Sequence, residues 1–274
     1  MGKITGIGWT NSTFNIVHGC VEIPHDPACT HCYAREFSKR LGKDLWGKTK
    51  PRQQMGEHYW NDPLRWDRKA AAAGIRHKVF CSSMADVFED HPDLVAPREQ
   101  LWKLIERTPN LIWQLLTKRP ENMKGMVPAS WRHCWPTNIW AGTTVANQEW
   151  ADKRCPILAE IPARVRWLSV EPMFGPMDLS KHFEAGHESG GPAGWIQDPS
   201  PFTWTVVGGE SGNGARPMKR EWVTDLLAQC RKYKVAFFFK QKGNVMAKEM
   251  GCKDAKGADP SEFPEEFRVQ EFPA

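Results

Sequence analysis

The chain has 274 residues, of which 41% are hydrophobic and 25% are charged, and its formal net charge is +5. This composition is typical of a soluble globular protein whose core needs no disulfide staples. Apolar runs near the roughly 20 residues of a membrane-spanning helix are absent from the sequence, and residues 1–9 lack the apolar centre of a signal peptide. We therefore expect a cytoplasmic protein without a membrane partner, whose mild basic bias permits a nucleic-acid partner but does not require one.

Short apolar runs rich in Val, Ile, Phe and Trp alternate along the chain with longer amphipathic stretches. The apolar runs predict buried strands at residues 14–17, 79–84, 111–117, 138–143, 165–170, 204–209 and 235–240. The amphipathic stretches predict helices at residues 31–41, 60–72, 97–107, 147–161 and 219–232. Such alternation is typical of parallel strands joined by right-handed crossovers. We expect an α/β fold with a partial or complete TIM-like (β/α) barrel of parallel strands.

Polar or charged side chains follow several of the predicted strands. They occur at Ser82-Ser83-Met84-Ala85-Asp86, Thr117-Lys118-Arg119, Ser169-Val170-Glu171-Pro172, Gly208-Gly209-Glu210-Ser211 and Lys240-Gln241. The carboxyl ends of parallel strands meet at one end of a barrel, where active sites of this architecture lie. The pattern therefore predicts a functional site at that end.

Two segments lack the periodicity of the rest of the chain. Residues 180–201 are rich in Gly, Pro, Ser and His, which predicts a long loop insertion. Residues 244–274 contain Glu, Lys, Pro and Gly with little periodicity, which predicts a C-terminal tail on the surface. We therefore expect a single barrel domain over residues 1–243, with the insertion near 180–201, followed by the tail.

Three of the eight cysteines are clustered with the spacing C-x8-C-x2-C, at Cys20, Cys29 and Cys32. In a reducing cytosol, clustered cysteines are candidates for metal binding or redox chemistry rather than for disulfides. The C-x2-C pair lets two thiolates face one metal centre, and the prolines between Cys20 and Cys29 favour a loop that returns to the same point. A 4Fe–4S cluster normally takes four cysteines. Three would leave one iron with an open position for a cofactor or a substrate.

Zinc is the main alternative ligand of these cysteines. With His18, His25 or His31 they would complete a closed Cys3His site. The spacing by itself does not separate zinc from an iron–sulfur cluster, and three unligated cysteines are a third alternative. The strand–helix alternation downstream favours the cluster, because a zinc knuckle does not need a barrel end lined with Glu, Lys and Ser.

A set of short motifs occurs in a fixed order along residues 8–243. The motifs are Trp9-Thr10, Thr13-Phe14-Asn15, Gly19-Cys20, Cys29-x2-Cys32-Tyr33-Ala34, Ser83-Met84-x-Asp86, Leu116-Thr117-Lys118-Arg119-Pro120, Glu171-Pro172, Val207-Gly208-Gly209-Glu210-Ser211-Gly212, Ala215-Arg216-Pro217 and Phe238-Phe239-Lys240-Gln241. Together they resemble the phage-associated three-cysteine-motif family. That family in turn resembles the radical S-adenosylmethionine superfamily, whose usual cysteine spacing is C-x3-C-x2-C.

The resemblance implies a radical-SAM-like partial barrel and an enzyme in which Cys20, Cys29 and Cys32 hold a 4Fe–4S cluster. It implies S-adenosyl-L-methionine on the open iron, an electron donor, and cleavage of the cofactor to a 5′-deoxyadenosyl radical. The residues expected around the cofactor and the substrate are Ser83, Asp86, Thr117, Lys118, Glu171, Gly208, Gly209, Glu210 and Lys240. Arg119 and Arg216 would add positive charge. The substrate stays open, although a nucleic acid or a nucleotide fits the basic charge and the phage association, and a partner protein is a further expectation.

Two other functions fit the same residues. The first is a nucleic-acid-binding protein that is stabilised by zinc or by a cluster and has no catalytic activity, which requires a closed fourth ligand. The second is a zinc-dependent barrel hydrolase in which Glu171 or Glu210 activates a water molecule. It predicts activity with zinc in air and no need for a reductant. The sequence assigns no catalytic residue.

Overall fold

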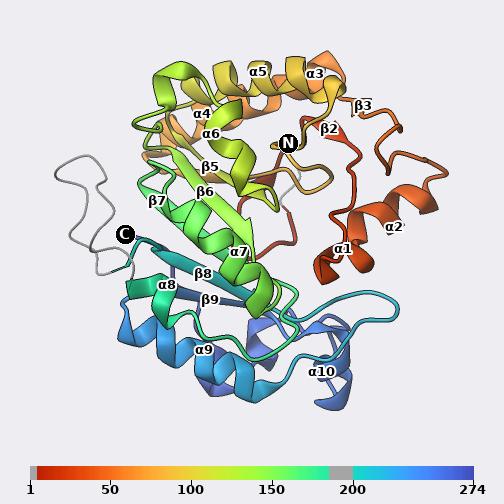
Figure 1. Cartoon of the computed structure of the whole chain (residues 1–274), viewed down its shortest axis with the longest axis vertical. Helices are drawn as coiled ribbons and strands as arrows, with labels where there is room; N and C mark the ends of the chain where they lie inside the picture. The colour runs from red at the N-terminus through yellow and green to blue at the C-terminus, as the bar shows by residue number, and fades with distance from the viewer. Residues whose placement is uncertain (1–4, 185–199) are drawn as a thin grey trace.

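The computed structural model describes residues 5–184 and 200–274. Seven parallel strands form a single sheet in the order β1-β4-β5-β6-β7-β8-β9, and the sheet curls into a half-barrel (Figure 1). The strands are β1 Ser12–Thr13, β4 His77–Cys81, β5 Leu111–Thr117, β6 Ile139–Thr144, β7 Val165–Val170, β8 Trp204–Gly208 and β9 Ala236–Gln241. The partial barrel of parallel strands predicted from the sequence is confirmed.

Helices connect the strands and pack along the outer face of the sheet (Figure 1). The longer ones are α4 Asp62–Ala73, α5 Pro92–Glu106, α7 Gln148–Ala159 and α9 Arg220–Lys232. The shorter ones are α1 Pro27–Thr30, α2 Tyr33–Arg40, α3 Glu57–Trp60, α6 Met123–Met126, α8 Ser180–Glu184 and α10 Gly243–Glu249. Single 3-10 turns are η1 Pro120–Asn122, η2 Ala129–Trp131, η4 Pro260–Glu262 and η5 Glu265–Phe267. In the described residues, no helix is long and apolar enough to cross a membrane.

The first predicted strand, residues 14–17, is wrong. The chain pairs with β4 only at Ser12–Thr13, and Val17–His18 instead forms β2, antiparallel to β3 at Gln53–Gln54. The reason lies at Asn15, whose backbone N–H donates to the Tyr59 hydroxyl at 2.9 Å and whose Oδ1 accepts from the Met84 backbone at 2.8 Å. These bonds draw the chain away from the sheet edge at this point.

The other predicted elements differ mainly at their ends. Strands β5 and β7 have the predicted bounds, whereas β4 begins and ends earlier, at His77 and Cys81. Helix α5 begins at Pro92 rather than near residue 97, because the His91 imidazole caps it by accepting from the Asp93 backbone at 3.2 Å. Of the predicted insertion, residues 180–184 are part of α8, and residues 185–199 lie outside the described residues.

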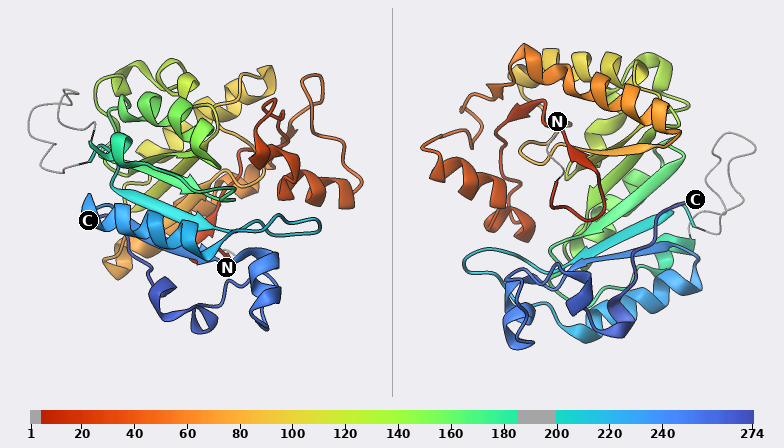
Figure 2. Two further views of the ribbon diagram at one scale, coloured as in Figure 1. Left: turned by 60° about the horizontal axis from the view of Figure 1, so that its bottom comes forward. Right: turned by 180° about the vertical axis from the view of Figure 1, so that it is seen from behind.

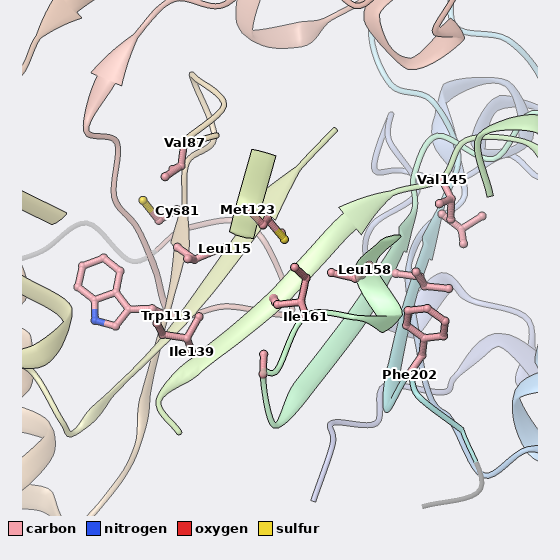
Figure 3. Packing of buried hydrophobic residues seen from close by; sticks show 14 of the residues in the cluster. Cys81, Val87, Trp113, Leu115, Met123, Ile139, Val145, Leu158, Ile161 and Phe202 are labelled. Carbon is pink, nitrogen blue, oxygen red and sulfur yellow. The ribbon is translucent and has the colours of Figure 1, made fainter. Parts of the chain in front are cut away.

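Two apolar layers lie on the two faces of the sheet. The outer layer, between the sheet and the helices, includes Trp113, Leu115, Ile139 and Leu158 (Figure 3). The inner layer lies on the concave face. We call its aromatic members the aromatic floor, and they are Trp9, Phe80, Trp140, Trp167, Trp204 and Phe238. A Cβ on Gly142 would lie 2.3 Å from the Trp167 ring, so only glycine fits there. The interior of the half-barrel is therefore filled with aromatic rings below the carboxyl ends of the strands.

The residues after β9 return to the sheet. Gln270 forms an antiparallel bridge with Phe238, and the Trp204 Nε1–H donates to the Glu271 carbonyl at 2.8 Å. Phe263 and Phe267 are buried with their ring centroids 4.9 and 4.8 Å from that of Phe239. These contacts cover the free edge of β9. The division into a barrel domain over residues 1–243 and a tail stays a prediction.

Candidate functional site

The three clustered cysteines lie on one segment beyond the carboxyl ends of the strands. Cys20 follows β2, Cys29 lies in α1, and Cys32 is the N-cap of α2. This segment and the loop that follows β8 project from the same end of the sheet (Figure 2). All three thiols are half-buried. We call residues 19–32 the cysteine loop.

A buried ion pair ties the cysteine loop to the barrel. The Asp26 carboxylate accepts from Nη2 of Arg154 at 2.7 Å, and the two side chains are 0% and 3% exposed. Arg154 also donates to the Thr144 carbonyl at the end of β6, at 2.8 Å. The other Asp26 oxygen caps α1 by accepting from the Ala28 backbone at 2.9 Å. Because both charges have hydrogen-bonded partners, the pair holds the loop in one place.

Arg119 forms a second tie, directly at Cys20. Its Nη2 donates to the Val21 carbonyl at 2.7 Å, and its Nη1 lies 3.9 Å from the Cys20 sulfur. The same Nη1 donates to Asp86 at 2.9 Å. Arg119 therefore brings a fixed positive charge to the first cysteine of the motif.

Asp86 was expected to contact the cofactor, but its oxygens are already occupied. They accept from Arg119, from the Thr117 hydroxyl at 2.6 Å, and from two backbone N–H groups, those of Lys118 and Phe88. Burial tends to raise the pKa of Asp86, but Arg119 and these hydrogen bonds outweigh it and hold the pKa below its usual value. Asp86 and Thr117 therefore position Arg119 and the Lys118 backbone.

Lys118 is the charged neighbour that the cysteines share. Burial lowers the pKa of its ammonium group, but Cys29 and Cys32, when they are ionised, and the carboxylates of Asp26 and Asp86 outweigh burial and raise it. In the described part of the chain, its Nζ has no hydrogen-bond partner. Lys118 is thus an uncommitted cation beside the cysteine loop.

Cys20 and Cys29 are poor thiolates in their present surroundings. Burial, followed by the Asp86 charge, raises the pKa of Cys20 to about 12, with Arg119 opposing. Burial also raises the pKa of Cys29, with Lys118 opposing. Deprotonation of these thiols therefore calls for more positive charge than the two side chains supply. A bound metal centre provides such charge, because it deprotonates coordinating thiols outright.

The side chains around the cysteine loop differ in how well they fit the two metal centres expected from the sequence. In residues 5–184 and 200–274, His, Cys, Asp and Glu side chains form no group of three or more that could hold a metal ion. A closed Cys3His zinc site needs four ligands around one point, and the described residues gather neither these four nor the three cysteines around one point. An iron–sulfur cluster instead takes its thiolates on separate irons. Three half-buried cysteines on one tethered loop, beside Lys118 and Arg119, fit that donor set.

The glycine-rich loop after β8 closes onto the cysteine loop. Glu210 accepts from the Arg216 side chain at 2.6 and 2.9 Å and from its backbone at 2.8 Å. Arg216 also donates to the Pro27 carbonyl at 2.8 Å, and His31 Nδ1 lies 3.5 Å from Glu210. Burial tends to raise the pKa of Glu210, but these Arg216 contacts lower it. Glu210 is therefore committed to joining two loops, although the sequence indicated a cofactor ligand.

Gly209 has a packing role. A Cβ there would lie 2.2 Å from the Lys242 carbonyl, so the glycine lets the chain after β8 pass close to the chain after β9. Its neighbour Gly208 faces Glu171, whose Cδ would be 3.3 Å from a Cβ at that position. Of the two glycines, Gly208 is the one that borders the expected site.

Glu171 and Lys240 meet at the strand ends on either side of Gly208. The Lys240 ammonium lies 2.5 Å from Glu171 Oε1, and the side chains are 19% and 17% exposed. Glu171 directly follows β7, and Lys240 is the penultimate residue of β9. These two strands are the neighbours of β8. Glu171 and Lys240 pair with each other, but both are partly exposed, so a bound molecule can reach them.

Ser83 connects the barrel to α2. Its hydroxyl exchanges hydrogen bonds with the Asn15 amide at 3.2 and 3.3 Å, and its carbonyl accepts from the Tyr33 hydroxyl at 2.5 Å. The sequence pointed to Ser83 itself, but it did not reveal Asp26 and Arg154. Those two residues are 128 positions apart and have no local motif around them.

Comparison with known proteins gives two kinds of result. No curated protein matches the chain. Among solved structures, spore photoproduct lyase complexed with dinucleoside spore photoproduct is similar, with 9% identity and a TM-score of 0.47. A double mutant of that lyase with bound AdoMet and dinucleoside spore photoproduct has 10% identity and a TM-score of 0.46.

Each of these alignments covers 85% of this chain and 64% of the lyase, so the chain corresponds to less than two thirds of that protein. Identities this low carry no information about a shared activity. The match to a protein family is of another kind, because it extends over residues 4–266, nearly the whole chain. The chain belongs to the family described as Protein of unknown function (DUF5131).

Proposed function

We propose that this protein is a radical S-adenosylmethionine enzyme and that Cys20, Cys29 and Cys32 hold a 4Fe–4S cluster. One observation carries the proposal. The three thiols lie on a single loop that the Asp26–Arg154 pair and Arg119 tie to the carboxyl end of the half-barrel. When bound, such a cluster supplies the electron that cleaves S-adenosylmethionine to a 5′-deoxyadenosyl radical.

The chain's own polar groups have separate tasks in this proposal. Lys118, with its uncommitted ammonium group, binds an anionic group such as the cofactor carboxylate. Glu171 and Lys240 offer an acceptor and a donor to the cofactor amine, the ribose or the substrate. Gly208 leaves room between them. Ser83, Asp86, Thr117, Gly209 and Glu210 act by holding the surrounding loops in position.

The aromatic floor has a task as well. Trp167 and Trp204 are fully buried, with ring centroids 5.1 Å apart, and their rings fill the barrel beneath the strand ends. A site with this floor is closed to water from below, which protects a reactive intermediate from side reactions. We include in the proposal an external electron donor, a nucleotide or nucleic-acid substrate, and the phage association and partner protein that the motif resemblance implies.

The test is to purify the protein without oxygen, reconstitute it with iron and sulfide, and record its absorbance and its EPR spectrum after reduction, with and without S-adenosylmethionine. We expect a brown 4Fe–4S species whose spectrum changes when the cofactor is added. Cys29→Ala should abolish the cluster. Cys134→Ala is the matched control, because Cys134 is exposed and lies outside the cysteine loop.

A colourless protein that retains tightly bound zinc would overturn the proposal. It would instead favour the zinc-stabilised nucleic-acid-binding protein or, if zinc supports activity in air, the hydrolase. A cluster that forms normally in Cys29→Ala would also contradict the assignment of the ligands.

A further inference from the structure

Helix α2, which follows Cys32, carries an apolar stripe that is open to solvent. In the described residues, seven large apolar side chains are exposed, and three of them belong to this short helix and its C-cap. Tyr33, Phe37 and Leu41 are 55%, 46% and 52% exposed. They are spaced four residues apart, which places them on one face of the helix. The neighbouring face, with Ala34 and Ser38, is buried.

Positive charge accompanies this stripe. Arg40 lies three residues after Phe37 and seven after Tyr33, so it shares their face of the helix. It is exposed, and it has no hydrogen-bond or ion-pair partner within residues 5–184 and 200–274. Residues 33–52 contain seven Lys or Arg and two acidic side chains, a net charge of +5 that equals that of the whole chain. Two of these seven cations pair with carboxylates outside the segment, Arg35 with Glu22 and the buried Arg52 with Glu89, and the others leave an excess of positive charge around α2.

The stripe begins at the mouth of the half-barrel. The Tyr33 hydroxyl donates to the Ser83 carbonyl just beyond β4, and Tyr33 directly follows the last cysteine of the motif. From there the helix points away from the sheet (Figure 1). Eight residues separate Tyr33 from Leu41, a rise of about 12 Å. This length corresponds to about three or four stacked nucleotides at 3.4 Å each.

We propose that α2 binds single-stranded nucleic acid and leads it toward the cysteine loop. Exposed aromatic rings beside an available cation such as Arg40 are the combination that such ligands require, because the rings stack on bases and the cation neutralises a phosphate. This inference names the substrate class of the proposed reaction and rests on that reaction for its biological meaning. The binding itself needs neither the cluster nor the cofactor.

Two other occupants fit the apolar stripe less well. A membrane surface needs a larger apolar face than three side chains on two turns. Lysine is depleted at protein–protein interfaces, whereas Lys39, Lys43 and Lys48 lie on this helix or just after it. The excess of positive charge around the stripe, with the exposed Arg40 in it, favours a polyanion.

The experiment measures fluorescence anisotropy of the full chain with a labelled single-stranded DNA of about 12 nucleotides, the matching RNA, and the DNA duplex. Salt is varied between about 50 and 200 mM. We expect single strands to bind more tightly than the duplex. Phe37→Ala should weaken binding about tenfold. Arg40→Gln should weaken it at low salt and make the plot of log K against log salt shallower by about 0.7.

Each variant has a matched control on another helix or loop. Ile75→Ala removes an apolar side chain that is 55% exposed, and Arg68→Gln removes an exposed arginine of α4. Both controls should bind like the unmodified protein. Thermal melting of all four variants shows whether they are folded. If either Phe37→Ala or Arg40→Gln does not fold, the other variant still tests the surface.

Three outcomes would overturn the inference. The first is no binding of single strands, or equal loss in variants and controls. The second is equal affinity for the duplex. The third is Phe37-dependent binding to anionic vesicles, or Phe37-dependent self-association in sedimentation, in place of nucleic-acid binding. Failure of the proposed reaction is a separate result, because a protein that binds oligonucleotides through Phe37 but forms no cluster would retain this surface and lose the radical chemistry.

Discussion

The Asp26 carboxylate and the Arg154 guanidinium meet 2.7 Å apart in a fully buried ion pair. One residue belongs to the cysteine loop and the other to α7, so this pair sets where the three thiols lie relative to the barrel. Removal of one partner of such a pair leaves the other charge buried and uncompensated, which strongly lowers the free energy of unfolding. The first prediction follows from this relationship.

Arg154→Ala is expected to lower the free energy of unfolding by about 3–5 kcal/mol. Urea denaturation monitored by tryptophan fluorescence measures the change. Lys153→Ala is the matched control, because Lys153 pairs with Glu149 on the surface and such a pair contributes about 0–1 kcal/mol. Equal effects of the two substitutions would show that the buried pair does not hold the cysteine loop.

Arg119→Gln is expected to make the reduction potential of the cluster-loaded protein more negative. Arg119 places a positive charge and a hydrogen-bond donor 3.9 Å from the Cys20 sulfur. Both groups stabilise the reduced cluster, so their removal disfavours reduction. A net contribution of about 1 kcal/mol corresponds to about 40 mV for one electron.

Potentiometric titration followed by EPR measures this shift. Arg119→Lys, which keeps the charge, should show a smaller change, and the exposed Arg132→Gln should show none. An unchanged potential in Arg119→Gln would mean that Cys20 does not ligate the cluster or that Arg119 does not face it.

Gly142→Ala is expected to destabilise the protein, because the new methyl group would lie 2.3 Å from the fully buried Trp167 ring. Overpacking of this kind costs typically about 1–3 kcal/mol. Gly125→Ala is the control, since a Cβ at that position meets nothing within 4 Å. Denaturation midpoints that agree for the two variants would contradict the packing of the aromatic floor.

In the metal-free protein, Cys20 is expected to react slowly with iodoacetamide. Only the thiolate is nucleophilic, and burial raises the pKa of Cys20 to about 12. At pH 8 the thiolate fraction is then about one in ten thousand, and it grows about tenfold for each pH unit up to the pKa. Mass spectrometry of alkylated peptides between pH 7 and 10 should show this steep rise for Cys20 and faster labelling of the exposed Cys134. Rapid labelling of Cys20 at pH 7 would contradict it.

Lys240→Met and Glu171→Gln are each expected to weaken binding of S-adenosylmethionine to the cluster-loaded protein by about ten- to hundredfold. Each substitution removes one charge-assisted hydrogen bond, worth about 1.5–3 kcal/mol. Equilibrium dialysis with labelled cofactor measures the affinity. Lys124→Met is the control, because Lys124 pairs with Glu160 on the exposed surface. Unchanged affinity in both variants would move the cofactor site away from the ends of β7 and β9.

The local pattern of the sequence was sufficient for the fold class. Apolar runs and amphipathic stretches have short periods, so β5 and β7 were bounded correctly from a few residues each. The first strand was wrong because bonds from Asn15 to Tyr59 and Met84, distant in the sequence, compete with strand pairing. The C-x8-C-x2-C spacing likewise identified the cysteine loop, because those residues are close along the chain.

Only the tertiary structure decided what the charged residues at the strand ends do. Asp86 and Glu210 looked like free ligands in the sequence, but Arg119 and Arg216 occupy them. Lys118 was expected near the cofactor, and the fold leaves its ammonium group uncommitted beside Cys29 and Cys32. The physical reason is that a hydrogen-bonding partner is chosen by proximity in space, which the order of residues along the chain does not encode for pairs as far apart as Asp26 and Arg154.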